Sequence, residues 1–235
     1  MVQHEKFYHY CAITSPASSS SRNDITDFLY TLFHLHPNNT CQPSHIEPLR
    51  GIYGGSVGVA DLRILSIFQL FESTRRTSIT SLLSQWSATP DVISANALEA
   101  LQSLEPSRVL KTCLEFPDWR HLSLDVTANP PGSDLLYDPV FVLLLLSQTD
   151  DAPPSALAWV QFFRTNVVSL ILRSLSAKDS RIRELAWGQM ASLYKALEVR
   201  NRRAHTLASS LICYSRPQIC KRSRTSSISS IYSKT

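Results

Sequence analysis

Four side chains that could bind zinc fall within residues 34–45 of the sequence, namely His34, His36, Cys41 and His45. Imidazole nitrogen and cysteine thiolate are common zinc ligands in proteins. The spacing H-x-H-x4-C-x3-H does not match a familiar closed site, and it divides the four residues between the end of an expected helix and a Pro-rich loop. We therefore expect two exposed histidines, a half-buried cysteine and no bound metal. One equivalent of zinc in the purified protein would contradict this.

Four of the six glycines lie between Gly51 and Gly58, in the segment GIYGGSVG. A Walker A loop would carry Lys-[Ser/Thr] directly after its last glycine, and a dinucleotide-binding loop would read G-x-G-x-x-G after a strand. Neither pattern is present, and the segment follows an expected short helix. We interpret it as a flexible turn at which two helices cross.

The remaining sequence gives no sign of a catalytic site or a cofactor. It contains no Ser-His-Asp order typical of hydrolases, no HExxH motif and no isolated carboxylate pair, and serine is too abundant to be informative. The aromatic residues Trp159, Phe162 and Phe163 occupy apolar positions, which favours a core over a base-stacking platform. We therefore expect a protein without enzymatic activity.

Composition predicts a folded intracellular chain. The 235 residues are 43% hydrophobic and 18% charged, whereas wholesale disorder needs low hydrophobicity and high charge. The longest apolar run, residues 140–146, is far shorter than the roughly 20 residues that span a bilayer. The five cysteines are scattered and the first residues include no apolar signal segment, which indicates a reducing compartment.

Helical periodicity dominates the sequence, and period-two alternation is rare. We expect an all-α fold of paired antiparallel helices. The expected helices cover residues 23–36, 77–86, 96–104, 106–116, 140–146, 155–175 and 180–199, with a short helix around Pro48 and a clear helix after Gly58. The first should bury Phe28, Leu32 and Leu35, and the helix after Gly58 should bury Ile64, Leu65, Phe68 and Phe71.

Residues 179–186, DSRIRELA, fit the pattern D-x-x-[apolar]-R-x-x-A that is typical of HEAT-type repeats. Asp179 can cap the helix start, and Arg183 can reach a carboxylate of a neighbouring repeat. Ile182, Leu185, Ala186, Leu193 and Leu197 should form the buried face. An ordinary capped helix has the same spacing, but the several helix pairs nearby favour a HEAT/armadillo-like helical repeat.

The net charge of +4 is the sum of two unlike parts. Residues 199–235 contain eight basic residues and no acid, which leaves 15 basic against 19 acidic residues, a charge of −4, in the rest. We expect a poorly ordered segment at 1–22, a helical-repeat domain at 23–198 and a basic, Ser-rich, disordered tail at 199–235. The tail could contact nucleic acid, an acidic partner or a targeting receptor, or have no specific partner. Its candidate nucleic-acid contacts are Arg200, Arg202, Arg203, Lys221, Arg222 and Arg224.

Four segments, in order, resemble motifs of the C-terminal domain of the nucleolar pre-ribosomal-associated protein family. Residues 53–65, YGGSVGVADLRIL, are similar to its Y-x-G-T-L-S-x-x-D-x-x-[IL]-L; residues 103–120, 137–143 and 166–186 resemble three further motifs. The matching positions are Tyr53, Gly55, Asp61, Leu65, Pro106, Val109, Thr112, Pro117, Arg120, Tyr137, Asp138, Pro139, Asn166, Asp179 and Arg183. Gly58 departs from the pattern, because the family has a capping serine there.

The resemblance implies a non-enzymatic scaffold in nucleolar assembly of the large ribosomal subunit, with a role in rRNA processing. Implied partners are other helical scaffolds, an RNA helicase and, nearby, pre-ribosomal RNA; no membrane or small-molecule substrate is implied. Family members are far longer than 235 residues, so we expect a fragment or truncated member. The alternative function is an adaptor that binds RNA or an acidic surface through residues 199–235.

Overall fold

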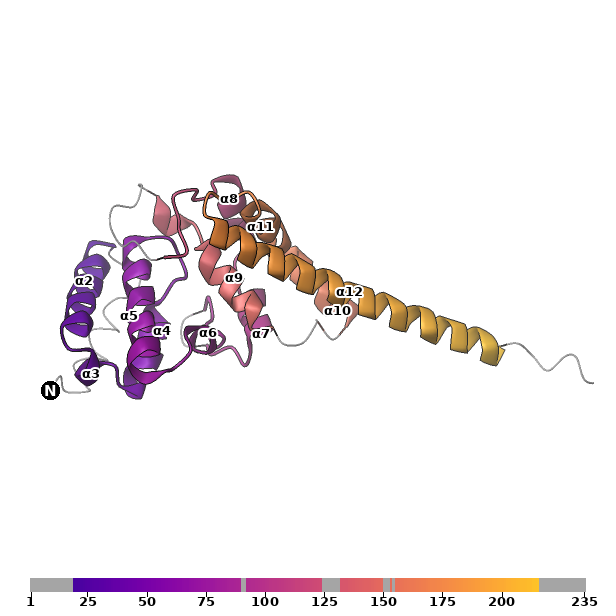
Figure 1. Cartoon of the computed structure of the whole chain (residues 1–235), viewed down its shortest axis with the longest axis horizontal. Coiled ribbons are helices and arrows are strands. Elements are labelled where there is room, and N and C mark those ends of the chain that lie inside the picture. The colour runs from indigo at the N-terminus through magenta and orange to yellow at the C-terminus, as the bar shows by residue number, and fades with distance from the viewer. Residues whose placement is uncertain (1–18, 90–91, 124–131, 150–152, 154, 216–235) are drawn as a thin grey trace, which may run out of the picture. The chain divides into compact units, whose positions relative to one another are not determined.

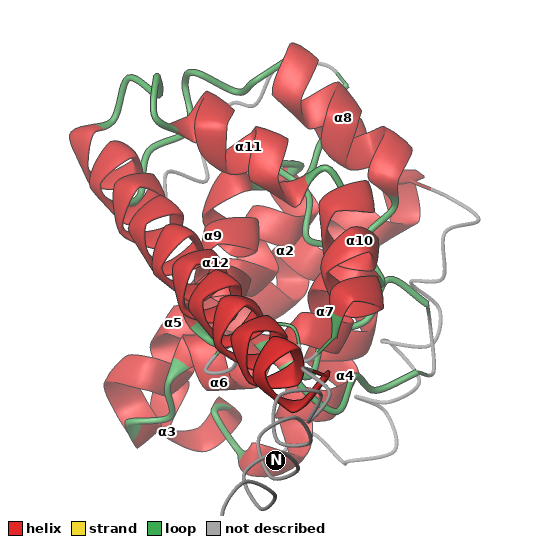
Figure 2. Cartoon of the chain, turned by 90° about the vertical axis from the view of Figure 1, so that its right-hand side faces the viewer, coloured by secondary structure: helices red, strands yellow, loops and turns green. Residues whose placement is uncertain are grey.

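The computed structural model describes residues 19–89, 92–123, 132–149, 153 and 155–215, with side chains described between 22 and 200. These residues form helices and loops, with no strand among them (Figure 2). The all-α prediction is therefore confirmed. The helices are α2 (Ser19–Leu35), α3 (Pro37–Thr40), α4 (Ile46–Ile52), α5 (Val59–Arg75), α6 (Ile79–Leu83), α7 (Ala97–Gln102), α8 (Pro106–Leu114), α9 (Pro139–Ser147), α10 (Ala156–Arg164), α11 (Val167–Ser174) and α12 (Ser180–Ser215), with 3-10 turns at Pro43–His45 and Ser133–Leu135.

Helices α2 and α5 lie side by side near the N-terminus (Figure 1). The buried residues of α2 are Thr26, Leu29 and Phe33, whose ring lies 6.1 Å from that of Phe71. The prediction that Phe28 and Leu35 face the core is wrong, because both are more than half exposed. A polar residue, Thr26, occupies the buried stripe instead, and its hydroxyl is satisfied by the carbonyls of the preceding turn.

Helix α9 forms the centre of the core, with seven of its nine residues buried. It packs against α6, α7 and α11, so apolar side chains are needed around its whole circumference. The Phe141 ring meets the rings of Tyr53 and Trp86 edge to face at 5.3 and 5.0 Å. Such pairs add to the stabilisation from apolar burial.

The region predicted as one helix at 155–175 is two helices, which corrects that expectation. The helices α10 and α11 are separated at Asn166, whose φ of 62° lies in the left-handed region. Asparagine tolerates this conformation better than most residues, so it can end one helix and begin the next.

Helix α12 runs from Ser180 to Ser215, and the chain divides within it into two compact units: the first unit ends at Leu193 and the second begins at Tyr194. Ile182 and Ala186 are buried as expected, whereas Leu197 is exposed. The helix continues to Ser215, within the part predicted as a disordered tail at 199–235, and residues 216–235 lie outside the described part. Likewise α2 begins at Ser19, inside the predicted N-terminal segment, and residues 1–18 are not described. The repeat type stays a prediction.

The described helices include none that combines the length and the apolarity of a membrane span. Helix α9 is very apolar but has only nine residues, and α12 is long but carries many charges.

Gly55 provides a sharp test of this packing. Its φ is +65°, and a Cβ there would lie 2.5 Å from the Phe141 ring. We expect Gly55→Ala to lower the free energy of unfolding by about 2–4 kcal/mol, from backbone strain and overpacking, measured by urea denaturation. The matched control is Gly51→Ala in α4, where nothing lies within 4 Å of the new Cβ; it should be neutral or stabilising by up to about 1 kcal/mol. Equal effects of the two changes would contradict this packing.

Candidate functional site

Two loops far apart in sequence pair at the centre of the first unit. The Val57 N–H donates to the Leu136 carbonyl at 3.2 Å, and the Asp138 N–H donates to the Gly55 carbonyl at 2.8 Å. Ser56 and Tyr137 form an isolated antiparallel bridge. We call residues 54–57 and 136–138 the central junction. It joins the α2–α5 half of the core to α9.

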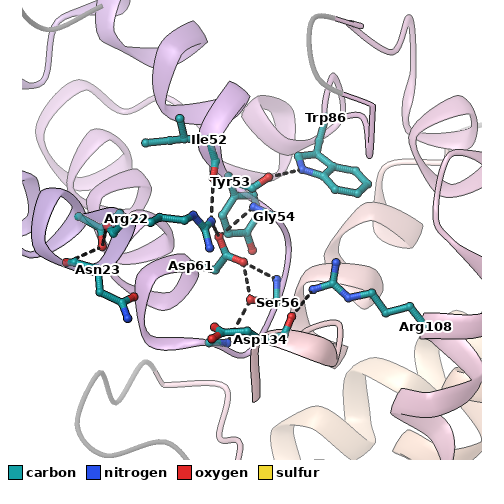
Figure 3. Close-up of polar contacts among 12 residues, drawn as sticks. Arg22, Asn23, Ile52, Tyr53, Gly54, Ser56, Asp61, Trp86, Arg108 and Asp134 are labelled. Atoms are coloured by element: carbon teal, nitrogen blue, oxygen red, sulfur yellow. Dashed lines mark hydrogen bonds and ion pairs between the residues drawn. The ribbon is translucent and has the colours of Figure 1, made fainter. Parts of the chain in front are cut away.

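Asp61 holds the first loop of the central junction from inside the first turn of α5 (Figure 3). Its Oδ1 accepts the Gly54 N–H at 2.8 Å and a bond from Arg22, and its Oδ2 accepts both the N–H, at 2.9 Å, and the hydroxyl of Ser56. The carboxylate is 1% exposed. Arg22 also donates to the Ile52 carbonyl at 2.8 Å, so one ion pair links α2, α4 and the loop.

Gly58 is the N-cap of α5 and offers no side-chain cap. Ser56 partly compensates, because its hydroxyl accepts the Gly58 N–H at 3.2 Å. The Asp134 carboxylate occupies the space where the Cβ of a Gly58 side chain would lie. Asp134, which precedes the second loop of the central junction, therefore lies beside the start of α5.

Asp138 holds the second loop of the central junction and caps α9. Its Oδ1 accepts the Val140 N–H at 2.9 Å, and its carboxylate pairs with Arg120, whose Nη2 lies 2.9 Å from Oδ2. Pro139 follows at the first helical position, where no N–H is needed. Both partners of the ion pair are almost fully buried, so removing either one would leave an uncompensated charge.

Two buried tyrosines, Tyr53 beside the central junction and Tyr137 within it, bond to neighbouring segments. The Tyr53 carbonyl accepts the Trp86 indole N–H at 2.7 Å. Burial raises the pKa of Tyr53 well above its ordinary value, and the nearby Asp138 and Asp61 charges raise it further, so the phenol stays protonated. Tyr137 donates its N–H to Thr112, and its hydroxyl accepts the Glu105 N–H.

Several other motif residues lie at element boundaries, whereas Leu65 is buried within α5 and Val109 and Thr112 are buried within α8. Pro106 starts α8, and its carbonyl accepts the Asn166 side-chain amide at 3.0 Å. Pro117 is buried after α8, and its carbonyl accepts the Arg120 N–H at 2.9 Å. The segments therefore brace α8 against α11 and position the arginine that pairs with Asp138.

Asp179 caps α12 and fixes a distant loop. Its Oδ1 accepts the Arg181 N–H at 2.8 Å, and its Oδ2 accepts the Leu122 N–H at 2.7 Å. The Leu122 bond is the main cause of a lowered Asp179 pKa, with the Arg181 N–H and His121 also contributing. The expected reach of Arg183 to a neighbouring carboxylate is corrected: its Nη1 donates to the Ala177 and Lys178 carbonyls.

Of the four zinc candidates, two histidines are exposed as expected, whereas the cysteine differs from expectation. Cys41 is fully buried, not half-buried, and burial raises its pKa. His34 and His36 are exposed, whereas His45 is buried with its Nδ1 2.5 Å from the Thr40 carbonyl. Within the described residues, no three His, Cys, Asp or Glu side chains gather in a metal-binding arrangement.

The six basic candidates for nucleic-acid contact do not form a described site. Arg200 is half-buried on α12, and Arg202 and Arg203 lie further along the same helix. Lys221, Arg222 and Arg224 lie outside the described residues.

The sequence analysis did not identify Arg22 as a site residue. No local sequence pattern marks it, because its partner Asp61 is 39 residues away.

The described residues thus define an all-α protein whose buried carboxylates hold backbone and guanidinium groups in place. Two curated proteins are similar to the chain. Nucleolar pre-ribosomal-associated protein 1 of Mus musculus is 26% identical over 203 residues, and the Homo sapiens protein of the same name is 26% identical over 201 residues. Each match covers 77% of this chain but 9% of the relative's length. No family model and no solved structure matches the chain.

The hydrogen bonds and the ion pair of Asp61 predict that an isosteric change at this residue lowers the free energy of unfolding by a large amount. Asp61→Asn puts an amide donor among N–H and guanidinium donors, so we expect a loss of about 3 kcal/mol in the free energy of unfolding. The control is Asp27→Asn, because Asp27 is 58% exposed and pairs with Arg63 at 2.8 Å. That change should cost less than about 1 kcal/mol. Urea denaturation measures both, and equal losses would show that the cluster does not stabilise the fold.

Asp179 predicts a pH-dependent contribution. Because its folded pKa lies below the ordinary value of 3.8, the folded chain binds this proton more weakly than the unfolded chain does. The stabilisation is complete above the unfolded pKa and is lost as the pH falls through the folded pKa. We expect Asp179→Asn to be less stable than the parent at pH 7, with the difference shrinking below pH 3.8. A difference that is constant between neutral and acidic pH would exclude this role for the charge.

Proposed function

We propose that this chain is a non-enzymatic helical scaffold for nucleolar assembly of the large ribosomal subunit, and that it corresponds to the C-terminal domain of the nucleolar pre-ribosomal-associated protein family. Its partners would be other pre-ribosomal assembly proteins, including helical scaffolds and an RNA helicase, with pre-rRNA nearby. Its location would be the nucleolus. The observation that carries the proposal is the similarity to nucleolar pre-ribosomal-associated protein 1 over 77% of the chain.

The position of the motif residues supports the family assignment. Tyr53, Asp61, Tyr137 and Asp138 are distant in sequence, yet all four are buried in or against the central junction. A resemblance that arose by chance would have no reason to select residues that meet in space. Asn166 and Asp179 extend the same pattern, because each bonds to a segment more than fifty residues away.

The bonds made by the buried carboxylates support the proposal of a non-enzymatic scaffold. The buried carboxylates of Asp61 and Asp138 are occupied by backbone N–H, hydroxyl and guanidinium donors. A catalytic carboxylate must instead be able to reach a substrate or its proton. The function would therefore lie in a rigid surface that these bonds maintain.

Affinity purification tests the proposal. We expect a tagged chain expressed in a eukaryotic cell to concentrate in nucleoli and to recover precursors of the large-subunit rRNAs in excess over precursors of the small-subunit rRNA. Asp27→Asn serves as a folded control with an altered surface charge. Recovery of neither precursor, or of both equally, would contradict the proposal.

A basic-tail adaptor is the alternative function, favoured by the eight basic residues and no acid in 199–235. The variant Arg200→Gln/Arg202→Gln/Arg203→Gln removes three charges while keeping good helix formers in α12. Under the scaffold proposal it retains precursor recovery and changes only the salt dependence of RNA binding. Loss of recovery from a folded triple variant would favour the adaptor.

A further inference from the structure

The end of α5 carries a sequence pattern that the proposed function does not use. Residues 75–79 read Arg-Arg-Thr-Ser-Ile, which places two guanidinium groups three and two residues before Ser78 and an apolar side chain directly after it. Kinases select substrates largely by such charge patterns. Basophilic Ser/Thr kinases bind arginines at these two positions through carboxylates and the following side chain in an apolar pocket.

The local backbone presents Ser78 outside a helix. Helix α5 ends at Arg75, and Arg76 has φ 57° in the left-handed region, so the chain turns sharply there. Ser78 is exposed and extended, with φ −61° and ψ 128°, before α6 begins at Ile79. Its hydroxyl lies 2.7 Å from the Thr80 hydroxyl and makes no capping bond to the α6 backbone.

We propose that Ser78 is a phosphorylation site for a basophilic Ser/Thr kinase that uses ATP. The Ser78 Oγ attacks the γ-phosphorus of ATP and passes its proton to the kinase base. The new Oγ–P bond forms as the bond from the γ-phosphorus to the β,γ-bridging oxygen breaks, and ADP leaves. Arg75 and Arg76 carry two positive charges, and the phosphate adds about −1.5 to −2, so the modification nearly neutralises this corner.

Access to the kinase requires a small opening of α6. Ile79 is 7% exposed and must enter the apolar pocket of the enzyme, and Arg75 must release the Cys41 and Asn38 carbonyls that it binds at 2.9 and 3.0 Å. Helix α6 has five residues and is anchored by Ile79 and Leu83. Segments this short open at a lower free energy than the global unfolding of a domain.

Ser66 gives an internal control for recognition in the folded chain. It also has an arginine three residues before it, Arg63, but lies in the middle of α5 with no second arginine. A kinase that reads the folded surface should therefore modify Ser78 and leave Ser66 unmodified.

Site-resolved mass spectrometry of the full chain tests the proposal, after incubation with Mg-ATP and the catalytic subunit of a cAMP-dependent kinase. We expect Ser78 to approach full modification while Ser66 stays unmodified, and Ser78→Ala to remove that phosphopeptide alone. Arg76→Gln should slow the Ser78 reaction by more than about tenfold, as expected for one lost partner of a charge pair. Leu83→Ala, which loosens α6, should accelerate it.

Three results would overturn the proposal. The first is the absence of phosphate on Ser78 in the parent chain, because the native fold would then hide the site. This holds whether or not Ser78 is modified in Leu83→Ala. The second is an unchanged rate in Arg76→Gln. The third is modification of Ser66 as fast as Ser78, because the kinase would then be reading an unfolded chain.

Discussion

The structure depends on one constraint: the two loops of the central junction must be held together although neither belongs to a regular sheet. Backbone N–H groups that are buried without partners cost as much as lost hydrogen bonds. Asp61 removes this cost for Gly54 and Ser56, and Asp138 does so for Val140 at the start of α9. Each carboxylate is in turn neutralised by an arginine from a distant segment, Arg22 or Arg120.

This arrangement explains how a chain of mostly short helices keeps one core. Helices of four to nine residues are marginal alone, and tertiary packing must stabilise them. Helix α9 provides the shared apolar surface, and the central junction fixes where its N-terminus enters that core. The polar groups at the centre therefore fix the positions of the two loops and of the N-terminus of α9.

Sequence periodicity was enough to predict the helical class, and the D-x-x-[apolar]-R-x-x-A pattern was enough to predict the cap at Asp179. Periodicity failed where tertiary context decides: Phe28 is apolar but exposed, Thr26 is polar but buried, and Asn166 divides one expected helix. The arginine partner of Asp61 could not be predicted from the sequence, because a carboxylate in the first turn of a helix does not indicate an arginine 39 residues away. The motif resemblance selected several residues of the central junction without revealing what they contact.

Hydrogen–deuterium exchange of individual amides tests the central claim most directly, namely that the central junction is the most firmly held part of the first unit. The amides of Ser56, Val57, Asp138 and Val140 should exchange only through global unfolding, with protection equal to that of the α9 interior. Protection of these four amides at the lower level expected for exposed surface loops would contradict the claim.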